Sequence, residues 1–255
     1  MTSGLTARLL TLEMTGRRFD WQPGIYIRSI EGIDGGGDVS SQTVPRGFGV
    51  GSYDLDNVRD TPRLITVTAF AYERSDWALQ QRADQLSRVL AEEESSGWFT
   101  WQKNGQARRA LVRRNRFPEP VRRRGDDAIM DFSLGLRASD QRIYADSVTS
   151  GWGSVIEVEN RGGYPAPVVI DVRGSSGSGY TITGPRSKIV QVTASITAGT
   201  GHTYDADLGI LSIGGAPQVL GVNRSDRVEI PYGRHQFSVN NGCELRVKYA
   251  DTWAP

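Results

Sequence analysis

The sequence predicts a mainly β protein with two β-sandwich-type domains, the first of which contains a single α-helix and a hairpin. Three observations support this fold class. Only one segment of the 255 residues has a helical apolar period, one segment alternates strictly between apolar and polar residues, and the second half consists of short β-prone runs separated by turn residues. The length suits two domains of roughly 100 to 150 residues each. We expect domains at 1–148 and 149–255, because residues 147–154 are mostly small and the composition changes beyond them.

The first domain is expected to contain a strand at 64–72, which is rich in β-branched and aromatic residues. A helix follows at about 76–94, with Ser75 suited to its start and Gly97 placed after its end. Its apolar stripe at helical spacing consists of Leu79, Ala83, Leu86 and Leu90. The last turn carries three acidic residues that oppose the helix macrodipole and would suit a basic partner, namely Glu92, Glu93 and Glu94.

After the helix, the sequence predicts a hairpin. Runs at 98–102 and 107–117 flank the pair Asn104-Gly105, and both of these residues accept the positive φ of a type I′ turn. A further strand is expected at 128–136, where every second residue is apolar. This alternation predicts a strand that contacts a core on one face only.

In the second domain no helical period survives, and turn residues separate short β-prone runs, which is typical of a β-sandwich. The glycine and serine stretch 174–179 has strand signals on both sides and is interpreted as a long hairpin tip. Strands are expected near 155–159, 167–173, 179–183, 188–197, 202–206, 209–213, 226–230, 234–239 and 243–249.

The composition disfavours several kinds of chemistry. A single cysteine, Cys243, rules out an intramolecular disulfide and a cysteine-based zinc site. Neither His202 nor His235 lies in a motif that would place it beside a nucleophile, and there is no Gly-x-Ser-x-Gly motif. The spacing of His202 with Asp205 and Asp207 matches no established metal loop. We therefore expect no catalytic residues, no cofactor and no metal.

Targeting signals are also weak. The longest apolar runs are far short of the roughly 20 residues that a membrane-spanning helix needs. Residues 1–12 lack the apolar block of a secretory signal. We expect synthesis in the cytoplasm and no insertion into a membrane.

The strongest charge feature is the segment 103–124, which carries nine cationic side chains against one acidic side chain, Glu119. All but three of the chain's 30 Lys and Arg residues are Arg, which suits contacts with carboxylates or phosphates, although a GC-rich genome would give the same bias. Neighbouring strand residues point to opposite faces, so these cations cannot all cover one core. Three interpretations stay open: an exposed edge strand protected by charge, an interface with an acidic neighbouring subunit, and a lumen near DNA. The candidate interface or lumen residues are Arg108, Arg109, Arg113, Arg114, Arg116, Arg122, Arg123 and Arg124, together with Glu92, Glu93 and Glu94.

Aromatic residues of the second domain raise the question of carbohydrate binding, since sugar-binding sandwiches stack sugar rings on aromatic side chains. Core packing explains most of these residues. Tyr204 and Trp253 are weak candidates for glycan contact.

Four segments resemble one protein family. Residues 131–140, Asp-Phe-Ser-Leu-Gly-Leu-Arg-Ala-Ser-Asp, are similar to the end of the first domain in distal tail (Dit-like) proteins of long, non-contractile-tailed bacteriophages. The most specific match is Asn160-Arg-Gly-Gly-Tyr-Pro-Ala-Pro167, which resembles the family's N-x-G-x-x-P-x-P start of the second domain. The segments 204–215 and 230–239 resemble its glycine hairpin and its late proline-glycine turn, although here Tyr232 separates the proline from the glycine.

The resemblance covers most of the chain from about residue 40. It implies a hexameric ring of N-terminal β-sandwich domains, with galectin-like C-terminal sandwiches that project outward. One face of the ring would contact the tail tube protein or a tail terminal ring, the other would contact the hub that leads to the receptor-binding machinery, and double-stranded DNA would pass through the lumen. The family has no catalytic residues to transfer. In such a ring the basic segment 103–124 could face Glu92 to Glu94, or Asp54 to Asp60, of the next copy.

We therefore expect a structural virion protein of the phage tail tip that is not an enzyme. The alternative comes from another class: a carbohydrate-binding host-adhesion module of the tail tip, in which the second domain contacts the host surface through Tyr204 or Trp253.

Overall fold

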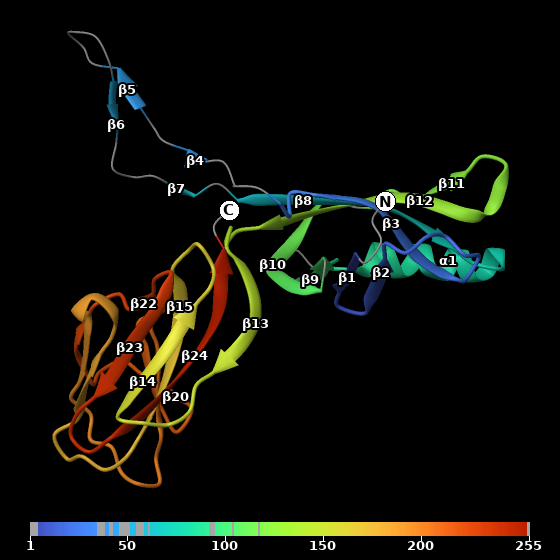
Figure 1. Cartoon of the computed structure of the whole chain (residues 1–255). Helices are drawn as coiled ribbons and strands as arrows, with labels where there is room; N and C mark the ends of the chain where they lie inside the picture. Colours follow the sequence, from blue (N-terminus) through green and yellow to red (C-terminus); the bar gives the residue numbers. More distant parts are fainter. Residues whose placement is uncertain are drawn as a thin grey trace. The chain divides into compact units, whose positions relative to one another are not determined.

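The computed structural model describes residues 5–34, 39–40, 43–45, 52–54, 59–60, 62–91, 95–103, 105–116 and 118–253. The chain divides into two compact units between Ile143 and Tyr144 (Figure 1). The expected boundary lies a few residues later, because β13 (Ile143–Thr149) pairs with β24 (Glu244–Trp253) and so contributes to the sheet of the second unit. Strands predominate in both units, and α1 (Asp76–Arg88) is the one α-helix of the described ranges. The predicted mainly β class is therefore confirmed.

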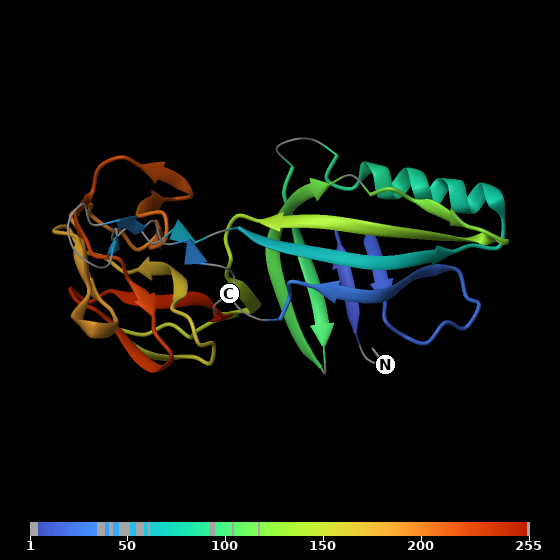
Figure 2. The same cartoon turned by 90° about the horizontal axis from the view of Figure 1, so that it is seen from above.

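Three long antiparallel strands form one part of the first unit: β3 (Gly24–Glu31), β8 (Arg63–Tyr72) and β12 (Asp126–Ala138). They lie in the order β12–β8–β3 (Figure 2). Every second residue of β8 and β12 faces the core, and for β12 the alternation in the sequence predicts this. The buried side chains of β12 include Phe132, Leu134 and Leu136.

Four further strands continue in the order β2–β1–β9–β10. Their bounds are Thr6–Leu9 for β1, Leu12–Thr15 for β2, Gly97–Lys103 for β9 and Gln106–Arg116 for β10. β10 also pairs with the last residues of β12, and β2 meets β3 at one parallel pair, so the strands curve around a common core. β9 and β10 form the predicted hairpin, in which Lys103 pairs with Gln106 and Gly105 has a φ of 76°.

The remaining strands of the first unit are short. β4 (Val39–Ser40) pairs with β7 (Arg59–Asp60), and β5 (Thr43–Pro45) pairs with β6 (Ser52–Asp54). β11 (Val121–Arg123) pairs with the first half of β12 and forms an edge of the sheet.

The helix α1 begins where the sequence predicts and ends earlier. Ser75 is the N-cap, and its hydroxyl accepts a hydrogen bond from the backbone N–H of Ala78 at 3.2 Å. Leu79 and Leu86 are buried, and such burial contributes about 1.5–3 kcal/mol for each side chain. The helix ends at Arg88 rather than near residue 94, because the following backbone is extended and Leu90 then adopts a φ of 49°. Leu90 is buried, but it reaches the core from this turn and not from the helix.

The second unit is a sandwich of two sheets. One sheet has the order β13–β24–β15–β18–β19–β20, with β22 paired to β15, and the other has the order β14–β23–β16–β17–β21. Tyr180, Phe237 and Leu245 are among the buried side chains of the core between them. The elements are β14 (Val155–Asn160), β15 (Ala166–Arg173), β16 (Tyr180–Thr183), the 3-10 turn η1 (Pro185–Ser187), β17 (Ile189–Val192), β18 (His202–Asp205), β19 (Ile210–Ile213), β20 (Ala216–Gln218), β21 (Val222–Ser225), β22 (Glu229–Ile230) and β23 (Gly233–Val239). The sandwich is as predicted, and its likeness to galectins stays a prediction.

Two strand predictions in this unit need correction. The run expected at 188–197 ends at Val192, and the run expected at 226–230 is reduced to β22. The chain instead forms β21, which ends at Ser225, just before the expected run. Asp226 follows directly, and its carboxylate accepts a hydrogen bond from Ile189 N at 2.9 Å and pairs with Arg224 at 3.0 Å, which ends the strand. β20 is also unpredicted, since proline at position 217 is unusual in a strand and is tolerated here at the sheet edge.

Asn160 fixes the start of the second unit. Its side chain is fully buried, and its amide donates to Tyr164 O at 2.7 Å and Ile230 O at 3.0 Å. Its side-chain oxygen accepts from Gly162 N at 2.9 Å and Thr252 N at 3.3 Å. A Cβ on Gly162 would lie 1.8 Å from Thr252 O, so only glycine fits there. The N-x-G pattern therefore has a structural role, because Asn160 links the start of the second unit to Ile230 and to Thr252.

Candidate assembly surface

The cationic segment 103–124 lies on β10, β11 and the connections beside them. The sequence leaves open whether its side chains meet solvent, a neighbouring subunit or DNA. Most of these cations have partners within the first unit, and they fall into three groups: one that stabilises a helix end, two that form ion pairs with α1 or β12, and four with other single contacts.

Arg114 stabilises the end of α1. Its guanidinium donates to three backbone carbonyls at the end of α1 and in the turn after it, Ser87 O at 3.0 Å, Val89 O at 3.3 Å and Ala91 O at 3.0 Å. The last carbonyls of a helix have no partners inside the helix and carry partial negative charge. Arg114 therefore supplies the positive charge that stabilises the end of α1, whereas the acidic residues at 92–94 would destabilise it.

Arg122 and Arg123 form ion pairs within the first unit. Arg122 pairs with Asp76 at the start of α1, and this contact raises the pKa of Arg122. Arg123 contacts both oxygens of Asp131, at 3.0 and 2.8 Å, and Arg28 lies 2.5 Å from the same carboxylate. The hydrogen bond from Arg123, aided by Arg28 and opposed by partial burial, lowers the pKa of Asp131.

Four other cations have local contacts. The guanidinium of Arg109 lies 4.6 Å from the ring centre of Trp98. The remaining contacts join Arg108 to Gln106 at 3.0 Å, Arg116 to Glu119 at 3.2 Å and Lys103 to Asp34 at 2.5 Å.

Arg113 and Arg124 are exposed and have no ion-pair partner within the described part of the chain. They are the cations of the segment that the first unit leaves available. The expected acidic counterparts Glu92, Glu93 and Glu94 lie outside the described residues, as do the side chains of Asp54 to Asp60. The pairing of this segment with a neighbouring copy stays a prediction.

Tyr204 and Trp253 occupy different environments. Tyr204 is 1% exposed and belongs to the core of the second unit, where its hydroxyl shares a hydrogen bond with Ser225. This burial corrects the expectation of a stacking ring at position 204, because a sugar cannot reach it. Trp253 is partly exposed at the end of β24, so a glycan contact there stays a prediction.

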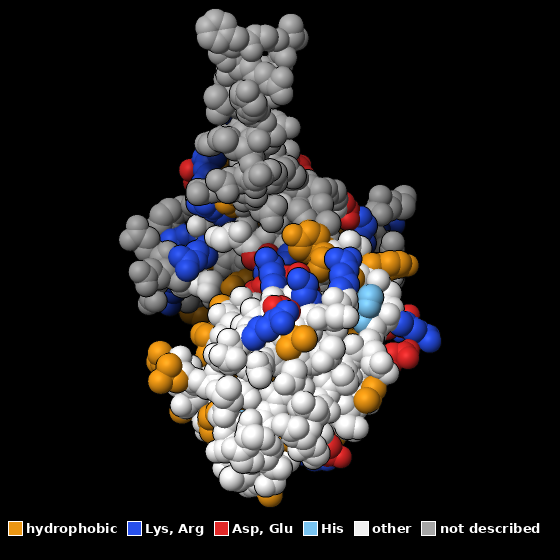
Figure 3. Space-filling model, turned by 90° about the vertical axis from the view of Figure 1, so that its left-hand side faces the viewer, with side chains coloured by type: hydrophobic (Ala, Val, Ile, Leu, Met, Phe, Trp, Pro, Cys, Tyr) orange, Lys and Arg blue, Asp and Glu red, His pale blue; other side chains and the backbone are white. Residues whose placement is uncertain are grey.

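The second unit also contains a charged cluster on the outer side of its first sheet. Asp171 accepts hydrogen bonds from Arg246 at 2.7 Å, Lys248 at 2.7 Å and Thr203 at 2.9 Å. Burial alone would raise the pKa of Asp171, but these three donors together outweigh it and lower the pKa. On the near face of this unit in Figure 3, most of the surface is neither hydrophobic nor charged.

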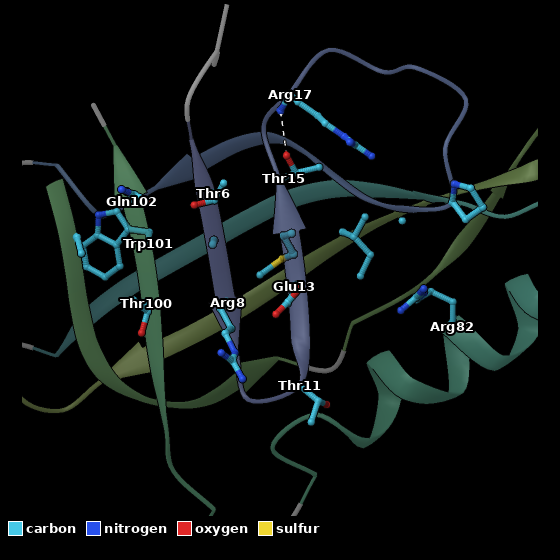
Figure 4. Close-up of a pocket in the computed structure, with 16 residues that line it drawn as sticks. Thr6, Arg8, Thr11, Glu13, Thr15, Arg17, Arg82, Thr100, Trp101 and Gln102 are labelled. Carbon is cyan, nitrogen blue, oxygen red and sulfur yellow. Dashed lines mark hydrogen bonds between the residues drawn. The ribbon is translucent and has the colours of Figure 1, made fainter. Parts of the chain in front are cut away.

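An open groove of about 670 Å³ lies beside β1 and β2 in the first unit. Figure 4 shows that Arg8 and Glu13 come from these paired strands, while Arg82 comes from α1. The charges of the groove are largely balanced, since Arg82 pairs with Glu73 at 2.8 Å and Arg17 lies 3.6 Å from Asp20. The walls of the groove are part polar and part apolar, with Met14, Ile25 and Trp101 among the lining residues, and they show no strong preference for an anion or a cation.

A cluster of aromatic side chains lies on the outer side of the β3–β8 pair. We call this surface the aromatic face: Trp21 is exposed, Phe19, Phe70 and Tyr72 are partly exposed, and Tyr26 is buried among them. Phe19 contacts the other four rings at centroid distances of 4.7 to 5.4 Å, and Tyr26 stacks on Phe70 at 5.2 Å. Arg28 and Arg123 lie over the ring of Phe70 at 5.3 and 5.4 Å. The aromatic face was not predicted from the sequence, although Phe70 and Tyr72 occupy strand positions opposite the buried residues of β8.

Other kinds of site find no support among the described residues. No group of three or more His, Cys, Asp or Glu side chains in these ranges is arranged to hold a metal ion. The described part of the chain contains no helix of the length and apolarity needed to cross a membrane.

No protein-family model and no curated protein matches the sequence. Among solved structures, the fold is similar to that of the Dit protein of phage SPP1, which is described as a paradigm of the hub adsorption apparatus in phages that infect Gram-positive bacteria. The likeness has a TM-score of 0.74 and covers 97% of this chain and 98% of that chain, at 13% identity. This chain has the Dit fold. A chain of the phage P2 baseplate also has a similar structure, with a TM-score of 0.50 and 8% identity over 96% of this chain and 97% of that chain. The Dit fold accounts for both units and for their order in the sequence.

Proposed function

We propose that this chain is a structural protein of a bacteriophage tail tip. It forms a ring, hexameric as in the family that the sequence resembles, between the tail tube and the baseplate hub that leads to receptor binding. The observation that carries the proposal is the likeness to SPP1 Dit along nearly the whole of both chains. DNA passes through the lumen of this ring, and the protein is located at the tail tip of the virion.

The chemistry of the described residues supports a binding role without catalysis. The charged side chains of the first unit mostly form ion pairs and helix caps, and the groove beside β1 and β2 has balanced charge. Contacts with the tail tube protein or a tail terminal ring, and with the hub, would use outer surfaces of the ring. The carbohydrate-binding alternative loses one of its two candidate residues, because Tyr204 is buried.

The proposal is tested by size-exclusion chromatography with light scattering and by electron microscopy of the full chain, alone and with assembled tail tubes. We expect six-fold rings, either free or at one end of the tube. A chain that stays monomeric at high concentration and does not bind tubes would contradict the ring function. A screen against host-surface polysaccharides, with Trp253→Ala as the matched variant, then tests the adhesion alternative.

A further inference from the structure

We propose that the aromatic face of one copy binds the exposed side of α1 of the next copy. The inference rests on the proposed function, because it names the two surfaces through which a ring closes. It differs from the expectation based on the segment 103–124, since most of those cations already have partners within the first unit.

The aromatic face has the composition of a protein interface. An antiparallel sheet face that meets water normally carries polar side chains. Here Phe70 and Tyr72 occupy such positions on β8, and Trp21 beside them is 61% exposed. Arg28 and Arg123 flank the rings. Trp, Tyr and Arg are the residue types enriched at the centres of protein interfaces that contribute most to binding.

The loop that carries Trp21 is held in place before any partner binds. Trp21 has a φ of 61°, a left-handed conformation that is uncommon for a bulky residue. The Tyr26 hydroxyl lies 2.7 Å from Asp20 Oδ1 and 2.6 Å from Gln22 O, and Asp20 also accepts from Gln22 N at 3.3 Å. Trp21 also contacts Phe19 and Tyr72 at centroid distances of 4.7 and 5.7 Å but stays 61% exposed, so the loop holds this ring in a fixed position from which it can bind a partner. Preorganised loops lose less entropy on binding.

The exposed side of α1 supplies a matching anchor. Trp77 is 73% exposed. Residues three, four and seven positions later share its side of the helix, and these are Gln80, Gln81 and Asp84. Gln80 donates a hydrogen bond to Asp84 at 3.2 Å. This surface, which we call the helix face, therefore presents one large apolar ring among polar and acidic groups, opposite the buried side of the helix.

The charges around the two faces do not oppose their binding to each other. The aromatic face is bordered by four arginines and two aspartates, namely Arg17, Arg18, Arg28 and Arg123 with Asp20 and Asp131. The helix face carries Asp84 against Arg88, and Asp76 in the first turn already pairs with Arg122 of the same copy, so the helix face has no excess of positive charge. Phosphate is a poorer partner, because the two aspartates would repel it and duplex DNA is contacted mainly through its backbone charges.

The positions of the faces suit a ring. The loop with Trp21 lies at the β3 side of the sheet, and α1 lies at the side of β12 (Figure 2). Two different, complementary patches on opposite flanks of a subunit produce a head-to-tail contact, which repeats from copy to copy and can close. A contact of one patch with itself would stop at a dimer.

Cysteine cross-linking of the full chain tests this arrangement. Arg18→Cys lies beside the aromatic face and Gln81→Cys lies on the helix face, and both positions are exposed. With a short bis-maleimide, the variant that carries both substitutions should give a ladder of trimers and larger species. Each single variant should stay uncross-linked, and a mixture of the two single variants should stop at dimers. The wild type, with its buried Cys243, is the control.

Two substitutions at the anchors test the contact itself. Trp21→Ala and Trp77→Ala, each introduced into the double-cysteine variant, should weaken association about 30-fold, the size of a typical interface anchor. Tyr232→Ala is the matched control, since Tyr232 is 72% exposed but belongs to the second unit.

The outcomes separate the two proposals. A single variant that cross-links with itself, or rings that form without a ladder in the double variant, would overturn the inference and leave the proposed function standing. Association that is unchanged by Trp21→Ala and Trp77→Ala would also overturn it. A wild-type chain that forms no ring, alone or on tubes, would contradict the proposed function itself.

Discussion

The cap that Arg114 places on α1 leads to a quantitative prediction. Arg114→Met keeps much of the aliphatic stem and removes the three hydrogen bonds to the end of α1 and the turn after it. The carbonyls of Ser87 and Ala91 can bind water instead, whereas that of Val89 is partly buried. The net value of each bond is about 0.5–1.5 kcal/mol, and the interaction with the helix end adds about 0.3–1 kcal/mol. We expect a loss of about 2 kcal/mol.

Hydrogen exchange of the α1 amides measures this loss locally, which matters because a chain of two units need not unfold in one step. Exchange in α1 should become roughly 30-fold faster, and the melting temperature of the first unit should fall by about 6–8 °C. Arg113→Met is the matched control, because Arg113 neighbours Arg114 on β10 but is exposed. It should change stability by less than about 0.5 kcal/mol.

Equal effects of Arg113→Met and Arg114→Met would refute the reasoning, since both remove one charge from the same strand. Faster exchange of the whole first unit, with no excess in α1, would also contradict it. The guanidinium is charged at every pH at which the protein is folded, so the difference between the two variants should not change between pH 5 and 9.

Three further predictions concern the second unit. Because the folded-state pKa of Asp171 is lowered, its ion pairs should stabilise the unit fully above about pH 4 and lose this effect as the pH falls further. Asp171→Asn should lower the free energy of unfolding, measured in urea, by about 2–3 kcal/mol at pH 7 and make this free energy depend less on pH in acid. Glu244→Gln, which breaks an exposed ion pair, should lower it by about 0.5 kcal/mol. Gly162→Ala should lower the melting temperature sharply, since the added Cβ meets Thr252 O at 1.8 Å, whereas Gly163→Ala meets nothing within 4 Å and should be nearly neutral; equal effects would count against the close-approach argument. Tyr204→Ala should lower the free energy of unfolding of the unit, measured in urea, by about 3–5 kcal/mol. An unchanged free energy of unfolding would contradict the place of Tyr204 in the core.

The sequence predicts elements well where one strong periodic signal fills the element. The hairpin at Asn104-Gly105, the alternating strand β12 and the start of α1 at Ser75 all have such signals. The strands β1 and β2 have only four residues each, too few for a period to stand out from chance. The end of α1 was missed because an apolar residue at helical spacing, Leu90, is buried from a left-handed turn.

The candidate surface was harder to predict for a related reason. Charged residues are visible in a sequence, but the partners of these residues are distant along the chain: Arg122 contacts Asp76, 46 residues earlier, and Arg114 contacts a helix end more than 20 residues earlier. Most of the cationic segment is therefore used within the fold. The aromatic face combines residues from the β2–β3 connection with residues of β8, and only the pairing of β3 with β8 brings them together.

The strand β24 comes after the other described strands of its sheet in the sequence, yet it lies between β13 and β15. The second unit therefore cannot complete its first sheet until β24 has emerged from the ribosome. Until then β15 presents an unpaired edge rich in Val and Ile, the kind of surface that promotes association of nascent chains. Removing Glu244–Trp253 would therefore delete an internal strand, and any segment fused after it must leave β24 free to insert.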